Sequence, residues 1–132
     1  MSKENVEIVR RLYAAFDDTD AENALRYVDP SVVVDASHRV DGRVGHGLEE
    51  GAAILAEWMD TWSGWSHEIE DIRDLGDRVL VIETQRGRGK KSEIDWEGRF
   101  AMLFDLEGGK VTHWTIYDDV AEGLEVAGLP VE

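Results

Sequence analysis

The second half of the chain alternates long segments of β-type sequence with short turns rich in glycine. The turn signals are Gly76-Asp77 and the stretches 87–91 and 107–109, each typical of a hairpin. Four long strands are therefore expected, over residues 65–75, 78–88, 92–106 and 110–118. Antiparallel strands of this length predict a strongly curved sheet, one face of which must be covered by the rest of the chain.

The first half supplies helices that can cover that face. Apolar residues recur at helical intervals up to Phe16, and a second short helix begins after Asp20 and stops at Asp29-Pro30. A third helix with a broad apolar face is expected over residues 48–63. The remaining expected elements are a strand over residues 31–35, a minor strand at 43–44 and a short terminal helix around Leu124. This order predicts an α+β protein.

The composition of the 132 residues narrows the class of protein. A single domain over residues 1–132 is expected for this length. The absence of cysteine excludes disulfides and thiolate metal sites. A net charge of -15 disfavours binding to nucleic acids and to anionic membrane surfaces. No stretch resembles a membrane span or a signal peptide, so we expect a cytoplasmic protein.

Asp35 is the first candidate for acid–base chemistry. It follows the apolar run Val32-Val33-Val34, and a carboxyl group that a buried strand carries into the interior is readied for proton transfer by desolvation. We therefore expect Asp35 to point into a pocket and to act as a base, with His38 orienting it or carrying a proton. The alternative is a structural role, in which the Asp35 carboxylate accepts backbone N–H bonds from the following loop.

The strand expected over residues 78–88 is partly apolar on both faces. Val79, Val81 and Glu83 share one face, and the alternate positions, also largely apolar, share the other. An apolar outer face is usually buried against a partner, so a homodimer through the sheet is expected. Arg99 on the next strand has two interpretations, an ion pair with a carboxylate such as Glu83 or a catalytic role.

Five tryptophans and several other aromatic residues are a high aromatic content for a domain of this size. Core packing accounts for most of them. The others are expected to line a cavity suited to a flat, apolar molecule that contains a ring, because such pockets are mainly aromatic with few polar groups.

Three stretches together are similar to one known family. They are Leu12–Phe16 with the aspartates that follow, Tyr27–Asp35, and the turn 108–111 with Trp114 and Tyr117. In this order and spacing they resemble the SnoaL-like group of the NTF2-like superfamily. The resemblance implies a cone-shaped α+β barrel around a deep pocket, with Asp35 where the related ketosteroid isomerase has its catalytic base. The oxyanion-hole donors of that isomerase are replaced by Leu12 and by a position near Ala101.

The resemblance also implies which side chains face the pocket. On the last strand they are Thr112, Trp114, Ile116 and Asp118, and on the preceding strand Glu97, Arg99, Ala101 and Leu103. The candidate catalytic residues are therefore Asp35, His38 and Arg99. The candidate substrate-binding residues are Tyr13, Phe16, Trp58, Trp62, Glu83, Trp114 and Ile116. No metal site and no cofactor are expected.

Two functions fit these expectations. The first is a homodimeric SnoaL-like protein whose pocket binds a small hydrophobic ligand and performs isomerisation, cyclisation or hydrolysis by acid–base chemistry without a cofactor. The alternative is a non-catalytic ligand-binding or protein-interaction module of the same fold. Polar donors are lost at Leu12 and Ala101, and also at Ile116, near which the related polyketide cyclases have an aspartate. These losses favour the alternative.

Overall fold

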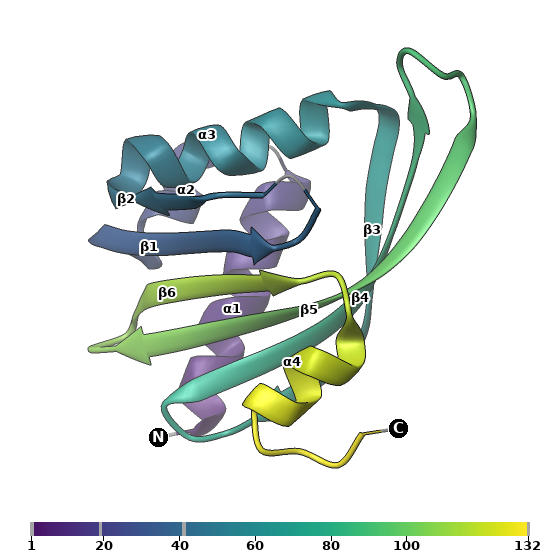
Figure 1. The fold of residues 1–132 in the computed structure, drawn as a ribbon. Helices are drawn as coiled ribbons and strands as arrows, with labels where there is room; N and C mark the ends of the chain where they lie inside the picture. Colours follow the sequence, from purple (N-terminus) through teal and green to yellow (C-terminus); the bar gives the residue numbers. More distant parts are fainter. Residues whose placement is uncertain (1, 19, 41, 132) are drawn as a thin grey trace.

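The computed structural model describes residues 2–18, 20–40 and 42–131 (Figure 1). The elements are α1 (Ser2–Asp17), α2 (Ala21–Leu25), β1 (Val28–His38), β2 (Val44–His46), α3 (Gly47–Asp60), β3 (Trp62–Asp74), β4 (Arg78–Gly89), β5 (Asp95–Glu107), β6 (Lys110–Tyr117) and α4 (Val120–Val126). Their order is the one that the sequence predicts. β1 begins earlier than expected because Val28 pairs with Val111 of β6, which also shortens α2.

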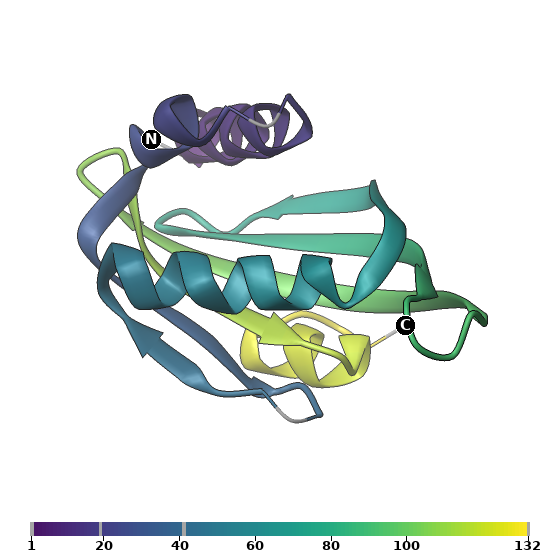
Figure 2. The same cartoon turned by 90° about the horizontal axis from the view of Figure 1, so that it is seen from above.

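The strands form one mixed sheet in the order β2-β1-β6-β5-β4-β3. β1 runs parallel to β6, and the other neighbouring pairs are antiparallel. The sheet is strongly curved, and α3 contacts β1 and β2 at one edge and β3 at the other (Figures 1 and 2). The expected α+β fold with helices over a curved sheet is confirmed.

Helices cover both faces of the sheet. Figure 2 shows α1 on one side of the strands and α4 on the other. The main hydrophobic core lies between the first three helices and the inner face of the sheet, where α1 contributes Val9 and Leu12 and the strands contribute Val34, Val81 and Phe104. These side chains are at most 2% exposed, so this inner layer accounts for most of the apolar burial.

α4 covers a second, smaller core on the outer face of β4 and β5. Leu80, Ile82, Ala101 and Leu103 pack there against Leu124 and Ala127 at the C-terminal end of the chain. The packing is close, because a Cβ added to Gly123 would lie 2.6 Å from the Cβ of Ala101. The apolar outer residues therefore need no second subunit to bury them. The homodimer stays a prediction, but the apolar outer face of β4 no longer supports it.

The register between β5 and β6 corrects one expectation about the faces of β5. Met102 pairs with Ile116 and Phe104 pairs with Trp114, and directly paired residues lie on the same face of a sheet. Met102 and Phe104 therefore face inward. The expectation that the alternate residues of β5 face inward was wrong. An error of one residue in the register of a strand reverses the face of all its side chains. The outward set is Glu97, Arg99, Ala101 and Leu103.

Capping side chains explain where three of the helices begin. Asp20 accepts a hydrogen bond from the backbone N–H of Asn23 at 3.1 Å and starts α2, and Asp119 does the same for α4 through Ala121 at 3.0 Å. At the start of α3 the carboxylate of Glu50 accepts the backbone N–H of His46 at 2.9 Å. Among the residues that the structure describes, no helix has the length and apolarity needed to cross a membrane.

Replacement of Leu124 by alanine should destabilise the protein by about 2–5 kcal/mol, because a side chain that is 2% exposed leaves a cavity between α4 and the sheet. The matched control is Val126→Ala on the same helix, where the side chain is 50% exposed and the expected change is within about 0.5 kcal/mol. Urea denaturation measures both. Equal effects of the two substitutions would contradict the role assigned to α4.

Candidate functional site

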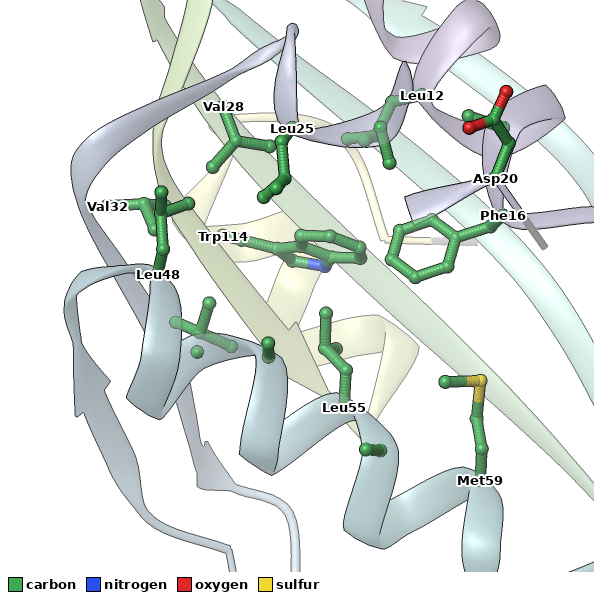
Figure 3. Close-up of a pocket in the computed structure, with 16 residues that line it drawn as sticks. Leu12, Phe16, Asp20, Leu25, Val28, Val32, Leu48, Leu55, Met59 and Trp114 are labelled. Carbon is green, nitrogen blue, oxygen red and sulfur yellow. The ribbon is translucent and has the colours of Figure 1, made fainter. Parts of the chain in front are cut away.

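A cavity of about 350 Å³ lies between the first three helices and the β1–β6 part of the sheet (Figure 3). Apart from Asp20, its lining consists of apolar side chains and glycine. Figure 3 shows Trp114 of β6 in the centre of this lining, with Phe16 of α1 beside it and Leu55 of α3 opposite. The rings of Phe16 and Trp114 meet edge to face, with centroids 5.6 Å apart. The cavity is therefore suited to an apolar molecule or to the apolar part of one.

One wall of this cavity depends on a glycine in α3. Gly51 is buried against β1, and a Cβ at that position would lie 2.8 Å from Cγ2 of Val34. A larger residue would require Val34 or α3 to shift. Val32 and Val34 of β1 face the cavity at this point, so the contact sets the distance between the helix and the sheet.

A smaller chamber of about 40 Å³ lies next to the larger cavity and has a different character. Phe16, Leu55, Met59 and Trp114 line both, so the two spaces are neighbours. By the usual volume requirement, the chamber has room for a few water molecules or one small polar group. Its polar lining residues come from α1, the end of β1, β3 and β4, and are Tyr13, Arg39, His67, Glu83 and Gln85.

Glu83 is the carboxylate at the centre of this polar group, and it is 1% exposed. Its Oε1 accepts a hydrogen bond from the hydroxyl of Tyr13 at 2.5 Å. Its Oε2 accepts one from Nε2 of Gln85 at 3.1 Å and lies 3.2 Å from Nδ1 of His67. Burial and then the negative charge of Glu83 raise the pKa of Tyr13 well above its usual range, so Tyr13 is a neutral donor. Both oxygens of Glu83 thus have partners, as a buried carboxylate requires.

His67 lies between two carboxylates. Its Nε2 is 2.6 Å from Oδ1 of Asp17, and its Nδ1 faces Glu83. Burial lowers the pKa of His67, but the hydrogen bonds to Glu83 and Asp17 and their negative charges outweigh burial and raise it above its ordinary value of 6.5. The ring also stacks on Tyr13 with centroids 5.3 Å apart. The protonated imidazole donates to both carboxylates and compensates part of their charge.

Two tryptophans orient Gln85. Its Oε1 accepts hydrogen bonds from the indole N–H of Trp58 at 2.8 Å and of Trp65 at 3.2 Å. With its oxygen held in this way, the amide nitrogen points to Glu83. The Glu83 carboxylate is therefore held by residues of three elements, α1, β3 and β4.

Arg39 brings a cationic group to the chamber. It directly follows β1, and its guanidinium carbon lies 4.2 Å from the ring centroid of Trp58, in a cation–π contact. Burial lowers the pKa of Arg39, and the negative charge of Asp118 opposes that shift. A guanidinium keeps its charge in proteins, so Arg39 is a half-buried cation. It also lines a neighbouring surface groove with Trp58 and Asp118.

The structure corrects the placement of Asp35. Val34 and Ala36 are buried on the inner face of β1, and Asp35 lies on the opposite face, outside the lining of either cavity formed by the described residues. Its Oδ1 accepts hydrogen bonds from the backbone N–H of Ser37 at 2.9 Å and from the Ser37 hydroxyl at 2.5 Å. The expectation that Asp35 points into the pocket is therefore wrong, and the geometry is that of the structural alternative.

The two other candidate catalytic residues also lie away from the chamber. His38 packs against Tyr117 on the outer side, with ring centroids 4.6 Å apart, and is 3.8 Å from carboxylate oxygens of Asp35 and Glu122. Arg99 faces outward from β5 and its Nε lies 3.1 Å from both carboxylate oxygens of Glu70. An ion pair on the surface is thus the better interpretation of Arg99, with Glu70 instead of Glu83 as its partner.

Most of the candidate substrate-binding residues do come together. Trp62 is the exception. Its ring stacks on that of Trp96 with centroids 4.2 Å apart and meets the ring of Trp58 edge to face. Asp17, Arg39 and His67 were not among the residues predicted for the site. His67 lies directly opposite Gln85 in the β3–β4 ladder, a pairing that only the structure gives. The predicted substrate-binding residues that line the small chamber are Tyr13, Phe16, Trp58, Glu83, Trp114 and Ile116.

No group of three or more histidine or carboxylate side chains within the described ranges is arranged to hold a metal ion. The carboxylates of Asp17 and Glu83 are bridged by His67. The titratable side chains of the chamber can take part in proton transfer and hydrogen bonding.

The chain matches the sequence model of the SnoaL-like domain over residues 9–114. No curated protein matches it. A protein from Jannaschia sp. CCS1 described as a SnoaL-like polyketide cyclase has a similar structure, with a TM-score of 0.79 and 20% identity, and the match covers 98% of this chain and 95% of that one.

Two further similar structures were determined with small molecules. TerC, co-crystallised with polyporic acid, has a TM-score of 0.77 and 22% identity over 95% of this chain and 98% of its own. A protein with a ketosteroid isomerase-like fold from Catenulispora acidiphila DSM 44928, in complex with trimethylamine, has a TM-score of 0.72 and 20% identity over 95% of both chains. At these identities the similarity shows the fold alone.

Replacement of His67 by glutamine should cost more stability in mild acid than in base. Because the folded state raises the pKa of His67, its contribution is complete below the ordinary value of 6.5 and is lost as the pH rises through the folded-state value. The loss in free energy of unfolding, measured with urea, should be larger at about pH 6 than at about pH 9. His113→Gln on the exposed face of β6 is the control, and a loss for His67→Gln that is the same at both pH values would contradict the charged state assigned to His67.

Proposed function

This chain belongs to the SnoaL-like domain family, and we propose that it binds a small, largely apolar molecule in its interior and transfers a proton to or from it without a cofactor. The observation that carries the proposal is the position of Glu83. This buried carboxylate lines the small polar chamber next to an apolar cavity of about 350 Å³. Isomerisation, cyclisation and hydrolysis all need a proton acceptor in such a place.

Binding is supported by the shape and chemistry of the larger cavity. A volume of about 350 Å³ falls in the range of small-molecule sites, which are usually apolar with a few polar groups at one end. Phe16 and Trp114 offer ring faces and edges to a flat molecule. Two proteins of similar fold were crystallised with polyporic acid and with trimethylamine, which agrees with small-molecule binding here.

Proton transfer is supported by the groups that surround Glu83. It is the one carboxylate among the described residues that line the chamber, so it is the group placed to accept a proton from a molecule bound there. His67 and Tyr13 hold its oxygens and can adjust their hydrogen bonds as charge on Glu83 changes. Asp17 anchors the far side of His67, which keeps the imidazole oriented.

One observation favours the alternative, a non-catalytic binding module of the same fold. The two oxygens of Glu83 already have three partners, Tyr13, Gln85 and His67, and a fully bonded carboxylate is also what a purely structural network requires. In that case the cavity binds its ligand and Glu83 only holds α1 to the sheet. Binding and proton transfer therefore need separate tests.

A substitution that fills the larger cavity should weaken binding. Ala56 of α3 lines it, and Ala56→Phe places a ring in the space that a ligand would occupy. We expect the affinity for the neutral probe 2-naphthamide, measured by calorimetry, to fall about tenfold or more. Ala14→Phe on the exposed side of α1 is the matched control and should leave the affinity unchanged. Failure of the wild-type protein to bind ring-containing probes would reject the proposal.

Removal of the Glu83 carboxylate should greatly slow proton transfer while binding survives. The probe is 2-tetralone in D₂O, in which exchange of the C–H protons next to the carbonyl is followed by NMR. Glu83→Gln preserves size, and we expect it to slow the exchange catalysed by the protein by about 100-fold or more. Asp35→Asn is the control and should have no effect, because Asp35 faces away from the cavities. If the wild-type protein binds 2-tetralone but exchanges it no faster than buffer, the binding module is the correct function.

A further inference from the structure

Two buried N–H donors of the inner chamber have no acceptor in the described part of the chain. They are Nε of Arg39 and Nε1 of Trp114. Both residues line the chamber, and Trp114 as a whole is 6% exposed. Figure 3 shows the indole nitrogen of Trp114 on the side that faces α3 across the cavity. Both side chains therefore line the small chamber, and Trp114 lines the larger cavity as well.

Unpaired donors in such a position need a physical explanation. A buried N–H without an acceptor costs about 1–3 kcal/mol, and most buried polar groups are paired. Other indoles around the chamber follow this rule, since Trp58 and Trp65 both donate to Gln85. Trp62 also has an unpaired indole nitrogen, but it does not line the chamber.

The charge of Arg39 is also uncompensated at close range. In the described ranges no carboxylate lies within 4 Å of its guanidinium, although most other arginines have such a partner. Asp118 acts on Arg39 only through its charge, and Glu83 is occupied by His67, Gln85 and Tyr13. The paired arginines are Arg11, Arg43, Arg73, Arg86, Arg88 and Arg99.

We infer that the ligand is an aromatic carboxylate, with its ring in the larger cavity and its carboxylate in the inner chamber, bound by Arg39 and the indole N–H of Trp114. This inference rests on the proposed function and names the class of molecule that the site takes. A planar guanidinium matches a carboxylate in geometry, and such charge-assisted bonds are the strong ones. The chamber of about 40 Å³ has room for one such group.

The overall charge of the protein makes this local cation necessary. With a net charge of -15, the molecule repels anions at long range. The preference for a carboxylate must therefore come from Arg39 and its neighbours at short range. The positive charge of His67 is already shared by Asp17 and Glu83, so Arg39 is the cation available to a ligand in the chamber.

Calorimetry with two matched probes tests the inference. 2-Naphthoate and 2-naphthamide share a ring system and differ in charge. We expect the affinity of the wild-type protein for naphthoate to be at least about tenfold higher than its affinity for naphthamide. Arg39→Gln should lower the affinity for naphthoate by about 10-fold to 100-fold and change the affinity for naphthamide by less than about twofold. Arg43→Gln, which removes an exposed arginine paired with Glu57, is the matched control and should change neither.

The indole N–H of Trp114 gives a second readout that does not depend on the Arg39 variants. Its ¹⁵N–¹H signal, assigned by its loss in Trp114→Phe, should move downfield when naphthoate binds and less when naphthamide binds. A stationary signal during naphthoate binding would overturn the part played by Trp114.

The outcomes separate this inference from the proposed function. Equal affinity of the wild-type protein for both probes overturns the carboxylate preference and leaves the binding cavity in place. If neither probe binds, both the carboxylate preference and the proposed function are wrong. If Arg39→Gln proves unstable in thermal unfolding, Arg39→Lys keeps the charge but removes the planar fork. That variant should bind naphthoate more weakly than the wild type, and unchanged binding would overturn the role of the Arg39 guanidinium.

Discussion

The buried carboxylate of Glu83 is the constraint on which the interior of this protein depends. An uncompensated charge in the middle of β4 would cost far more than one hydrogen bond can return, so the fold must bring several partners to it. Tyr13 comes from α1, His67 from β3 and Gln85 from β4 itself. The network therefore ties the first helix to the sheet. It also places a polar group within an otherwise apolar core.

The curvature of the sheet makes room for a site beside that network. Because α3 reaches from β1 to β3, the concave face is closed over by helices, and the space left near β1 and β6 is apolar. The polar chamber lies toward the β3–β4 side, where Glu83 and His67 are held. One interior thus combines an apolar region with a polar end, the combination that a site for a small amphipathic molecule needs.

Proteins with this fold differ in function because the side chains inside it differ. The carboxylate at the end of β1 illustrates the point, since the resemblance to ketosteroid isomerase implies a base there. In this chain the Asp35 side chain faces outward and its carboxylate is used by Ser37. The carboxylate that faces the interior is Glu83, three strands away in the sheet order. A family position therefore does not establish a role without the orientation of the side chain.

The sequence by itself determined the order of helices and strands, the curved α+β sheet and the presence of a terminal helix, because these follow from local periodicity and turn residues. Only the tertiary structure decided which face of β5 looks inward, because that depends on pairing with β6, and a shift of one residue reverses the face. Likewise Asp17, His67 and Glu83 are far apart in the chain, and only the packing of α1 on β3 and β4 brings them together.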